Sequence, residues 1–301
     1  MDDLFLVKGN TWCIDTGFTL ISVYKLNEKD IVLIDTGISI LRDNTKRLMS
    51  VLDREGFNVK AIIATHAHID HVGNNKVVVD KYGSKVYMYG SEAYLASSIE
   101  EIRMQHFLVP FEKVKNELLA LTSPVDYFIG TDDEFVEIEG HKFQVLHTPG
   151  HSPSHISIIT QDNVMVIGDV LMTNEEIEKA KLPYAMNFDI DFETKRKITN
   201  IKCDKYVFTH KGVRDNIIEE VEKNIEYIKS RANVILGYIE DGMSYDDIAA
   251  EVINCMNIKV HSRYVFFDIY GMIAPYIQYL EETGKIEGYY ENGYIRYRVL
   301  E

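Results

Sequence analysis

The sequence predicts a fold that mixes α-helices and β-strands, and three observations lead to that prediction. Short runs that alternate or are continuously apolar, typical of strands, occur at residues 19–25, 31–34 and 59–64. Residues 41–56 place apolar side chains at helical spacing between two of these runs. Four apolar runs end at a histidine or an aspartate, so the chain repeatedly presents a polar side chain at the end of a predicted strand.

The N-terminal part of the chain is expected to alternate between strands and helices. Residues 4–37 read as short strands with a polar turn at 27–30, and Ile34-Asp35-Thr36-Gly37 ends the last strand in a turn. The next predicted elements are a helix at 41–56, a strand at 59–64, a helix at 72–82 and a strand at 85–89.

Residues 91–123 interrupt this alternation with two predicted amphipathic helices. They cover 91–108 and 111–121 and are separated at Val109-Pro110, where proline breaks the helical pattern. Two interpretations of this helical insertion are open: its Met, Phe and Tyr side chains pack in a core, or it forms a substrate lid beside a functional site.

Strands are predicted again after residue 125. A strand at 142–146 leads into His147-Thr148-Pro149-Gly150-His151-Ser152-Pro153-Ser154-His155. A strand at 164–167 ends at Gly168-Asp169, and the apolar run Val207-Phe208-Thr209 ends at His210.

The C-terminal part has a different pattern. A long amphipathic helix is predicted from about 217 to 235, followed by a short helix that Ser244 caps and a second helix from about 264 to 283. Residues 285–298 are expected to form a two-stranded ribbon that turns at Glu291-Asn292-Gly293. We therefore predict a catalytic domain at 1–230 and a small winged-helix-like domain at 231–301.

The segment Thr65-His66-Ala67-His68-Ile69-Asp70-His71 is the most informative part of the chain. It places three histidines and one carboxylate within six residues, directly after the predicted strand at 59–64. Imidazole nitrogens and carboxylate oxygens are the ligands that zinc, iron and manganese prefer. The segment therefore predicts a metal site at the end of this strand.

The composition and net charge of the chain disfavour several classes of protein. The chain has 301 residues and a formal net charge of −15, which disfavours nucleic acid and anionic membranes as general partners. Its three cysteines show no CxxC spacing, so neither a disulfide framework nor a cysteine zinc site is indicated. The N-terminus carries acid where a signal peptide needs base, and no apolar run reaches transmembrane length; we therefore expect a cytoplasmic protein.

These motifs resemble those of the metallo-β-lactamase superfamily. Residues 65–73 match its hallmark, His151, Asp169 and His210 follow in the expected order, and residues 34–37 are similar to its early strand-end turn. The resemblance covers about residues 5–215 and implies an α+β fold, an αββα sandwich of two mixed sheets flanked by helices. It also implies two divalent metal ions, with zinc expected and iron or manganese as alternatives. By motif position, His66, His68 and His151 would hold one ion, Asp70, His71 and His210 the other, and Asp169 would bridge them.

Two such ions can share a water whose pKa falls towards neutrality, which predicts a hydroxide-based hydrolase. Asp70 would orient this nucleophile and pass a proton to the leaving group. We expect a small ester-type substrate, such as a thioester or lactone. His155 and Tyr184 are candidate substrate contacts, whereas His147 is expected to support the site without binding metal.

Two alternative functions were considered. One is an RNase Z-like nuclease, but residues 231–301 hold six basic side chains against eleven acidic ones, a poor footprint for phosphate binding. We expect this tail to pack on the catalytic domain or to mediate a homodimer. The other alternative is a mononuclear-iron sulfur dioxygenase, which shares similar ligands.

Overall fold

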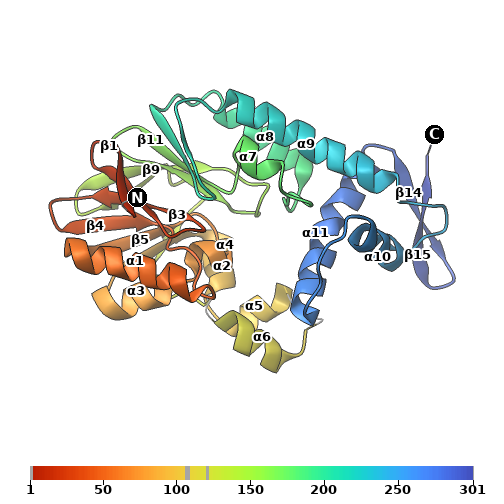
Figure 1. Ribbon diagram of the computed structural model, residues 1–301, viewed down its shortest axis with the longest axis horizontal. Helices are drawn as coiled ribbons and strands as arrows, with labels where there is room; N and C mark the ends of the chain where they lie inside the picture. Colours follow the sequence, from red (N-terminus) through yellow and green to blue (C-terminus); the bar gives the residue numbers. More distant parts are fainter. Residues whose placement is uncertain (1–2, 106–108, 120–121, 301) are drawn as a thin grey trace.

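Two β-sheets lie face to face and carry helices on their outer sides in the computed structural model (Figure 1). The structure describes residues 3–105, 109–119 and 122–300. The arrangement confirms the predicted αββα sandwich. Among the described residues, no helix combines the length and apolar character that a bilayer span requires.

The first sheet has seven strands in the order β1-β2-β3-β4-β5-β6-β7. Its first four strands pair antiparallel, and β4 to β7 pair parallel, so the sheet is mixed as expected. The strands are β1 (Leu4–Lys8), β2 (Thr11–Asp15), β3 (Leu20–Lys25), β4 (Asp30–Ile34), β5 (Asn58–Ala64), β6 (Lys85–Tyr89) and β7 (Tyr127–Ile129).

The second sheet has six strands in the order β13-β12-β11-β10-β9-β8. All neighbours pair antiparallel except β11 and β12, which are parallel. The strands are β8 (Phe135–Ile138), β9 (His141–His147), β10 (Ile156–Ile159), β11 (Val164–Gly168), β12 (Lys205–Phe208) and β13 (Val213–Arg214).

Continuous apolar strands are explained by burial on both faces. In β4, Val32 and Ile34 belong to the core between the sheets, whereas Ile31 and Leu33 pack in the core beneath the outer helices. Helices α1 (Arg42–Glu55) and α3 (Asn75–Tyr82) cover the first sheet. The ends of α8 (Phe188–Ile198) and α9 (Ile218–Leu236) cover the second.

One predicted helix begins later than expected and another is divided in the structure. The helix expected at 72–82 is α3, which begins at Asn75 and is preceded by the short helix α2 (Ile69–Val72). Gly73, between them, lies against the backbone of residues 37–39: a Cβ there would be 2.8 Å from the Ser39 amide and 2.9 Å from the Gly37 carbonyl. The helix expected at 91–108 is α4 (Gly90–Ala96) and α5 (Ile99–Gln105). The break lies at two serines, and the Ser98 hydroxyl accepts a bond from the Glu101 amide as a helix N-cap does.

The second helix of the insertion is α6 (Phe111–Leu118), shorter than the expected 111–121. Residues 106–108 and 120–121 of the predicted insertion lie outside the described residues. A short helix, α7 (Asn174–Ile177), follows β11. Helices α4, α5 and α6 share a core with the strand end that carries the histidine cluster.

The C-terminal part contains α10 (Tyr245–Cys255), α11 (Arg263–Glu282) and a hairpin of β14 (Ile286–Glu291) and β15 (Tyr294–Val299). Ser244 forms a capping box with Asp247 at the start of α10. The hairpin turns at Asn292-Gly293, both at positive φ, as a type I′ turn requires. This is the predicted order of helix, helix and hairpin; its identity as a winged helix stays a prediction.

Helix α9 runs continuously across the predicted domain boundary at residues 230 and 231. Its second half packs in one core with α8, α10 and α11. Within that core the Tyr276 hydroxyl donates a 2.6 Å hydrogen bond to the Pro183 carbonyl. The C-terminal elements are therefore packed directly on the segment that precedes α8.

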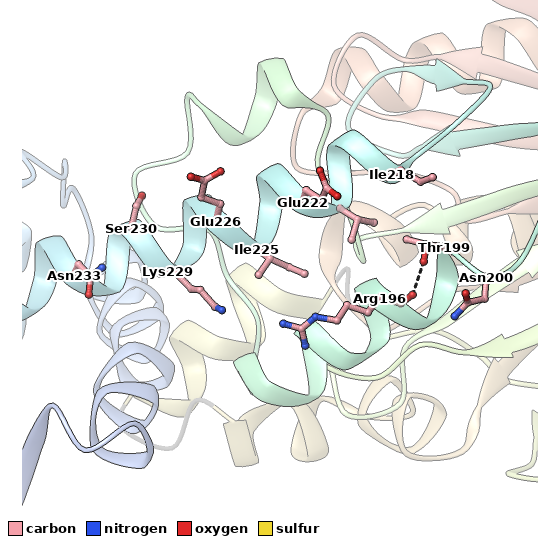
Figure 2. Close-up of a pocket in the computed structure, with 11 residues that line it drawn as sticks. Arg196, Thr199, Asn200, Ile218, Glu222, Ile225, Glu226, Lys229, Ser230 and Asn233 are labelled. Carbon is pink, nitrogen blue, oxygen red and sulfur yellow. Dashed lines mark hydrogen bonds between the residues drawn. The ribbon is translucent and has the colours of Figure 1, made fainter.

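An open groove of about 920 Å³ runs along α8 and α9 (Figure 2). Its walls carry charges of both signs, including Arg196, Lys229, Glu222 and Glu226. The groove contains none of the predicted site residues, so the site must be sought at the strand ends instead.

Candidate metal centre

The predicted ligands meet at one edge of the two sheets, where several strands end. The loop after β5 supplies His66 and His68, the following helix α2 supplies Asp70 and His71, and the loop after β9 supplies His151. Asp169 directly follows β11, and His210 follows β12. Because β11 and β12 are parallel, their carboxyl ends present these two side chains at the same edge.

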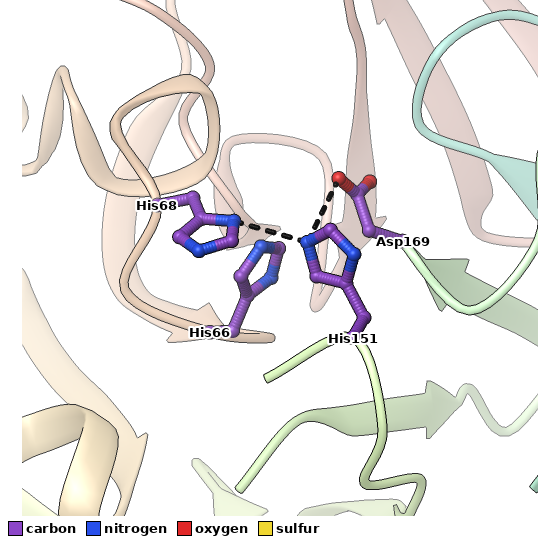
Figure 3. Close-up of side chains that lie close together, drawn as sticks. All are labelled: His66, His68, His151 and Asp169. Atoms are coloured by element: carbon purple, nitrogen blue, oxygen red, sulfur yellow. Dashed lines mark hydrogen bonds and ion pairs between the residues drawn. The ribbon is translucent and has the colours of Figure 1, made fainter. Parts of the chain in front are cut away.

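The first ligand group contains His66, His68, His151 and Asp169 (Figure 3). Each of them offers one ligand atom, and these atoms all lie within 4.8 Å of one another. Nε2 of His151 is 3.0 Å from Nδ1 of His68 and 3.5 Å from Oδ2 of Asp169. Three imidazoles and one carboxylate oxygen thus converge on one point.

The second ligand group contains Asp70, His71, Asp169 and His210, with one ligand atom from each again within 4.8 Å. Oδ1 of Asp169 is 3.1 Å from Nε2 of His71 and 3.5 Å from Nε2 of His210. His210 also lies 3.2 Å from Oδ2 of Asp70. Asp169 therefore belongs to both groups, one oxygen on each side, and the structure brings all seven predicted ligands together.

Two imidazoles of the first group, those of His66 and His151, are held in the neutral form that binds a metal ion. Burial and the neighbouring imidazoles lower the pKa of His66 well below its usual value. Burial also lowers the pKa of His151 to about 3, although Asp169 opposes that shift. Neutral imidazoles keep the lone pair that a metal ion needs.

The second group is dominated by its carboxylates. Burial lowers the pKa of His71, but Asp169, Asp35 and Asp70 outweigh it and hold that pKa well above its usual value. Burial acts in the same sense on His210, whose pKa is nevertheless raised to about 10 by Asp169 and Asp70. Burial opposes ionisation of Asp70, yet His71 and His210 lower its pKa to about 2. The carboxylates here favour a bound cation.

Buried atoms without hydrogen-bond partners show that these residues fit a metal ion. Among the described residues, Nε2 of His66, Nε2 of His71 and Oδ1 of Asp169 are buried and make no hydrogen bond. An unpaired buried polar atom costs about 1–3 kcal/mol. Divalent cations at the two groups would satisfy all three atoms, because each faces the centre and can offer a lone pair, Nε2 of His71 once it has lost its proton.

Asp35 supports the centre, although the sequence analysis assigned it no role. Its buried carboxylate accepts hydrogen bonds from the Thr65 amide (2.8 Å), the Thr65 hydroxyl (2.9 Å) and Nδ1 of His71 (2.7 Å). The bond to Nδ1 leaves Nε2 of His71 free to bind metal. The signal was present in the sequence, since Asp35 directly follows the apolar run of β4.

His155 takes a different place from the one expected. It is fully buried; its Nδ1 is hydrogen-bonded to the Thr148 hydroxyl (2.8 Å), and its Nε2 accepts the Asp169 amide (3.0 Å). Both ring nitrogens are therefore engaged inside the protein. In place of the expected substrate contact, we interpret His155 as a residue that positions the backbone of Asp169. Gly168 is required beside it, because a Cβ there would lie 2.4 Å from Nε2 of His155.

Tyr184 lies next to the first group. Its ring centroid is 5.6 Å from that of His151 and 6.3 Å from that of His68, and its carbonyl oxygen is 3.2 Å from Nδ1 of His151. Burial and the charges of Asp268 and Glu92 raise the pKa of its hydroxyl. His147 belongs to neither ligand group, and its ring packs edge-on against Tyr89.

Residues 14–210 match the family model of the metallo-beta-lactamase superfamily. The chain is 30% identical over 149 residues to the hydroxyacylglutathione hydrolase GloC of Haemophilus influenzae, a match that covers 48% of this chain and 63% of that protein. It is 28% identical over 163 residues to the probable metallo-hydrolase YflN of Bacillus subtilis, covering 50% of this chain and 58% of that one. Both matches span less than two thirds of the relative.

The fold also has a close counterpart among solved structures. The metallo-beta-lactamase family protein TTHA1429 from Thermus thermophilus superposes with a TM-score of 0.71 over 94% of each chain, at 18% identity. This likeness covers more of the chain than the family match does.

Proposed function

The chain belongs to the metallo-β-lactamase superfamily, and from that premise we propose that it is a metal-dependent hydrolase of small ester-type substrates such as thioesters or lactones. The observation that carries the proposal is the pair of ligand groups that share Asp169. Each group has the donors of a zinc site, and the sharing of one carboxylate is what a dinuclear centre needs.

The residues divide between two ions as their geometry suggests. His66, His68 and His151 would hold the first ion, and Asp70, His71 and His210 the second, with one oxygen of Asp169 directed to each group. Bound zinc, or alternatively iron or manganese, supplies a hydroxide nucleophile near neutral pH and positive charge for the substrate oxygen.

Asp70 is suited to the proton transfer. Its carboxylate is partly open to solvent, and its pKa of about 2 keeps it ionised at neutral pH. An ionised carboxylate accepts a hydrogen bond from the nucleophile and so orients it.

Tyr184 would bind the substrate from the other side of the first group. Its raised pKa keeps the hydroxyl protonated, so it can donate a hydrogen bond to a substrate oxygen. Its ring lies beside that of His151, with the two centroids 5.6 Å apart.

Apolar side chains near the centre support a small substrate with an apolar part. Phe18 is 41% exposed and its ring meets His210 edge-on at 5.4 Å. Met186 is 52% exposed, and its amide bonds the carbonyl of His151. Two relatives are named as hydroxyacylglutathione hydrolases, and an acyl group carried on glutathione is a thioester, which agrees with this class.

Elemental analysis of the purified protein, followed by a thioester, lactone and phosphodiester panel on the same sample, tests the proposal. We expect two metal ions per chain and ester-type turnover that is lost on chelation and in His68→Ala. The exposed His261→Ala, in the C-terminal part, serves as the matched control and should retain activity. A fully loaded protein that cleaves phosphodiesters and no ester would refute the substrate class; a chain that binds no metal would refute the hydrolase itself.

A further inference from the structure

Glu92 is a buried carboxylate that contacts both loops of the first ligand group. Oε2 accepts a hydrogen bond from the Ala67 amide (3.0 Å), and Oε1 accepts one from the Ser152 hydroxyl (2.6 Å). The Ser154 amide also donates to Oε1 at 3.3 Å, and the Ser154 hydroxyl bonds that of Ser91. Glu92 is only 2% exposed.

The fold explains why this side chain reaches both loops. Strand β6 pairs parallel with β5, so the two strands end at the same edge of the sheet. Helix α4 begins directly after β6, and Glu92 lies in its first turn. Ala67 lies between the ligands His66 and His68, and Ser152 follows the ligand His151.

Burying a carboxylate at this position costs free energy unless a nearby group stabilises its charge. No lysine or arginine of the described residues forms an ion pair with Glu92, and burial of an unpaired charge is costly. Three hydrogen-bond donors offset part of this cost. Cations held at the adjacent ligand group would offset more, which couples the charge of Glu92 to occupancy of that group.

We propose that Glu92 is a positioning residue that ties the loop of His66 and His68 to the loop of His151 and thereby sets the metal affinity of the first ligand group. The inference rests on the proposed metal centre. It assigns a role to the start of the helical insertion, and it links that insertion to Ser154 on the loop of His151.

The test measures each ligand group separately by cobalt(II) binding in competition with a chelator. In the His210→Ala background, which leaves the first group intact, Glu92→Gln should weaken cobalt binding about 10- to 100-fold. In the His68→Ala background, which leaves Asp70, His71 and His210 intact, Glu92→Gln should leave affinity unchanged. Glu100→Gln, at an exposed carboxylate of the same insertion, is the matched control.

Two further variants protect the test against a folding defect. Ser152→Ala removes one donor to Glu92 and should weaken the first group in the same direction by a smaller factor. Glu92→Asp keeps the charge on a shorter side chain and should recover less than full affinity, because it cannot reach both loops.

The outcomes separate this inference from the proposed function. Unchanged cobalt affinity of the first group in Glu92→Gln, or an equal loss at both groups, would overturn the positioning role while the metal centre stands. Absence of cobalt binding in the parent chain would overturn the metal centre and the inference with it.

Discussion

Replacing Asp35 by asparagine should disable the second ligand group by moving one proton. Asparagine keeps the size of the side chain, and it tolerates the positive φ of 62° at this position. Its amide has one acceptor oxygen, whereas the Asp35 carboxylate accepts three hydrogen bonds. If the amide NH2 faces His71, the ring must place its proton on Nε2, the atom 3.1 Å from Oδ1 of Asp169.

The magnitude follows from the contacts. Loss of one hydrogen bond to a charged group costs about 1.5–3 kcal/mol. At about 1.4 kcal/mol for each factor of ten, the same energy taken from metal binding is about a 10- to 100-fold loss of affinity. We expect this loss at the group that contains His71, and little change at the group of His66, His68 and His151.

Stepwise zinc binding in competition with a chelator, together with urea unfolding of the metal-free protein, measures both effects. Asp53→Asn, at an exposed carboxylate of α1 that pairs with Lys81, is the control. Retention of the second metal ion at parent affinity would refute the tautomer argument. Equal weakening of both ions would show that Asp35 acts on the whole edge of the sheet and not through His71.

Two further predictions concern pH and the C-terminal packing. In the metal-free protein the raised pKa of His71, and that of His210 at about 10, keep both rings protonated at neutral pH, so a metal ion must displace these protons. Metal affinity of the second group should therefore rise with pH, by up to about tenfold per pH unit for each displaced proton, between about pH 6 and about pH 9. The first group, in which the pKa values of His66 and His151 are low, should change less in the same titration, and an affinity that falls with pH would contradict the reasoning. Tyr276→Phe removes the 2.6 Å bond to the Pro183 carbonyl and should lower the free energy of unfolding by about 1–3 kcal/mol in urea, without changing metal content. An unchanged unfolding midpoint would show that this carbonyl finds another partner.

Much of the fold could be predicted from the sequence because its signals are local. Strand runs, the Ser244 cap and the Asn292-Gly293 turn depend on residues that are close in the chain, and each is present in the structure. These helix boundaries could not be predicted in the same way. Gly73, between α2 and α3, lies against the backbone of residues 37–39, which are distant in sequence, and has no room for a side chain.

The candidate site shows the same division. Residue type and position at the end of an apolar run predicted all seven residues that the structure brings together in the two groups. The supporting roles of Asp35 and Glu92 were not predicted, because the hydrogen-bond donors to each carboxylate lie in other segments of the chain. His155 was expected to contact substrate, but its spacing from His151 does not reveal that its ring points to the Asp169 amide.

The sequence by itself determined which side chains stand at the ends of strands, because the alternation of a strand and the turn after it are set by neighbouring residues. Only the tertiary structure decided that Asp169 directs one oxygen to each ligand group, and that Asp35, after β4, and Glu92, in α4, accept hydrogen bonds from the segments that carry the predicted ligands. Those contacts join segments from different strands and both sheets. They exist only when packing of the apolar faces brings the strand ends to one edge.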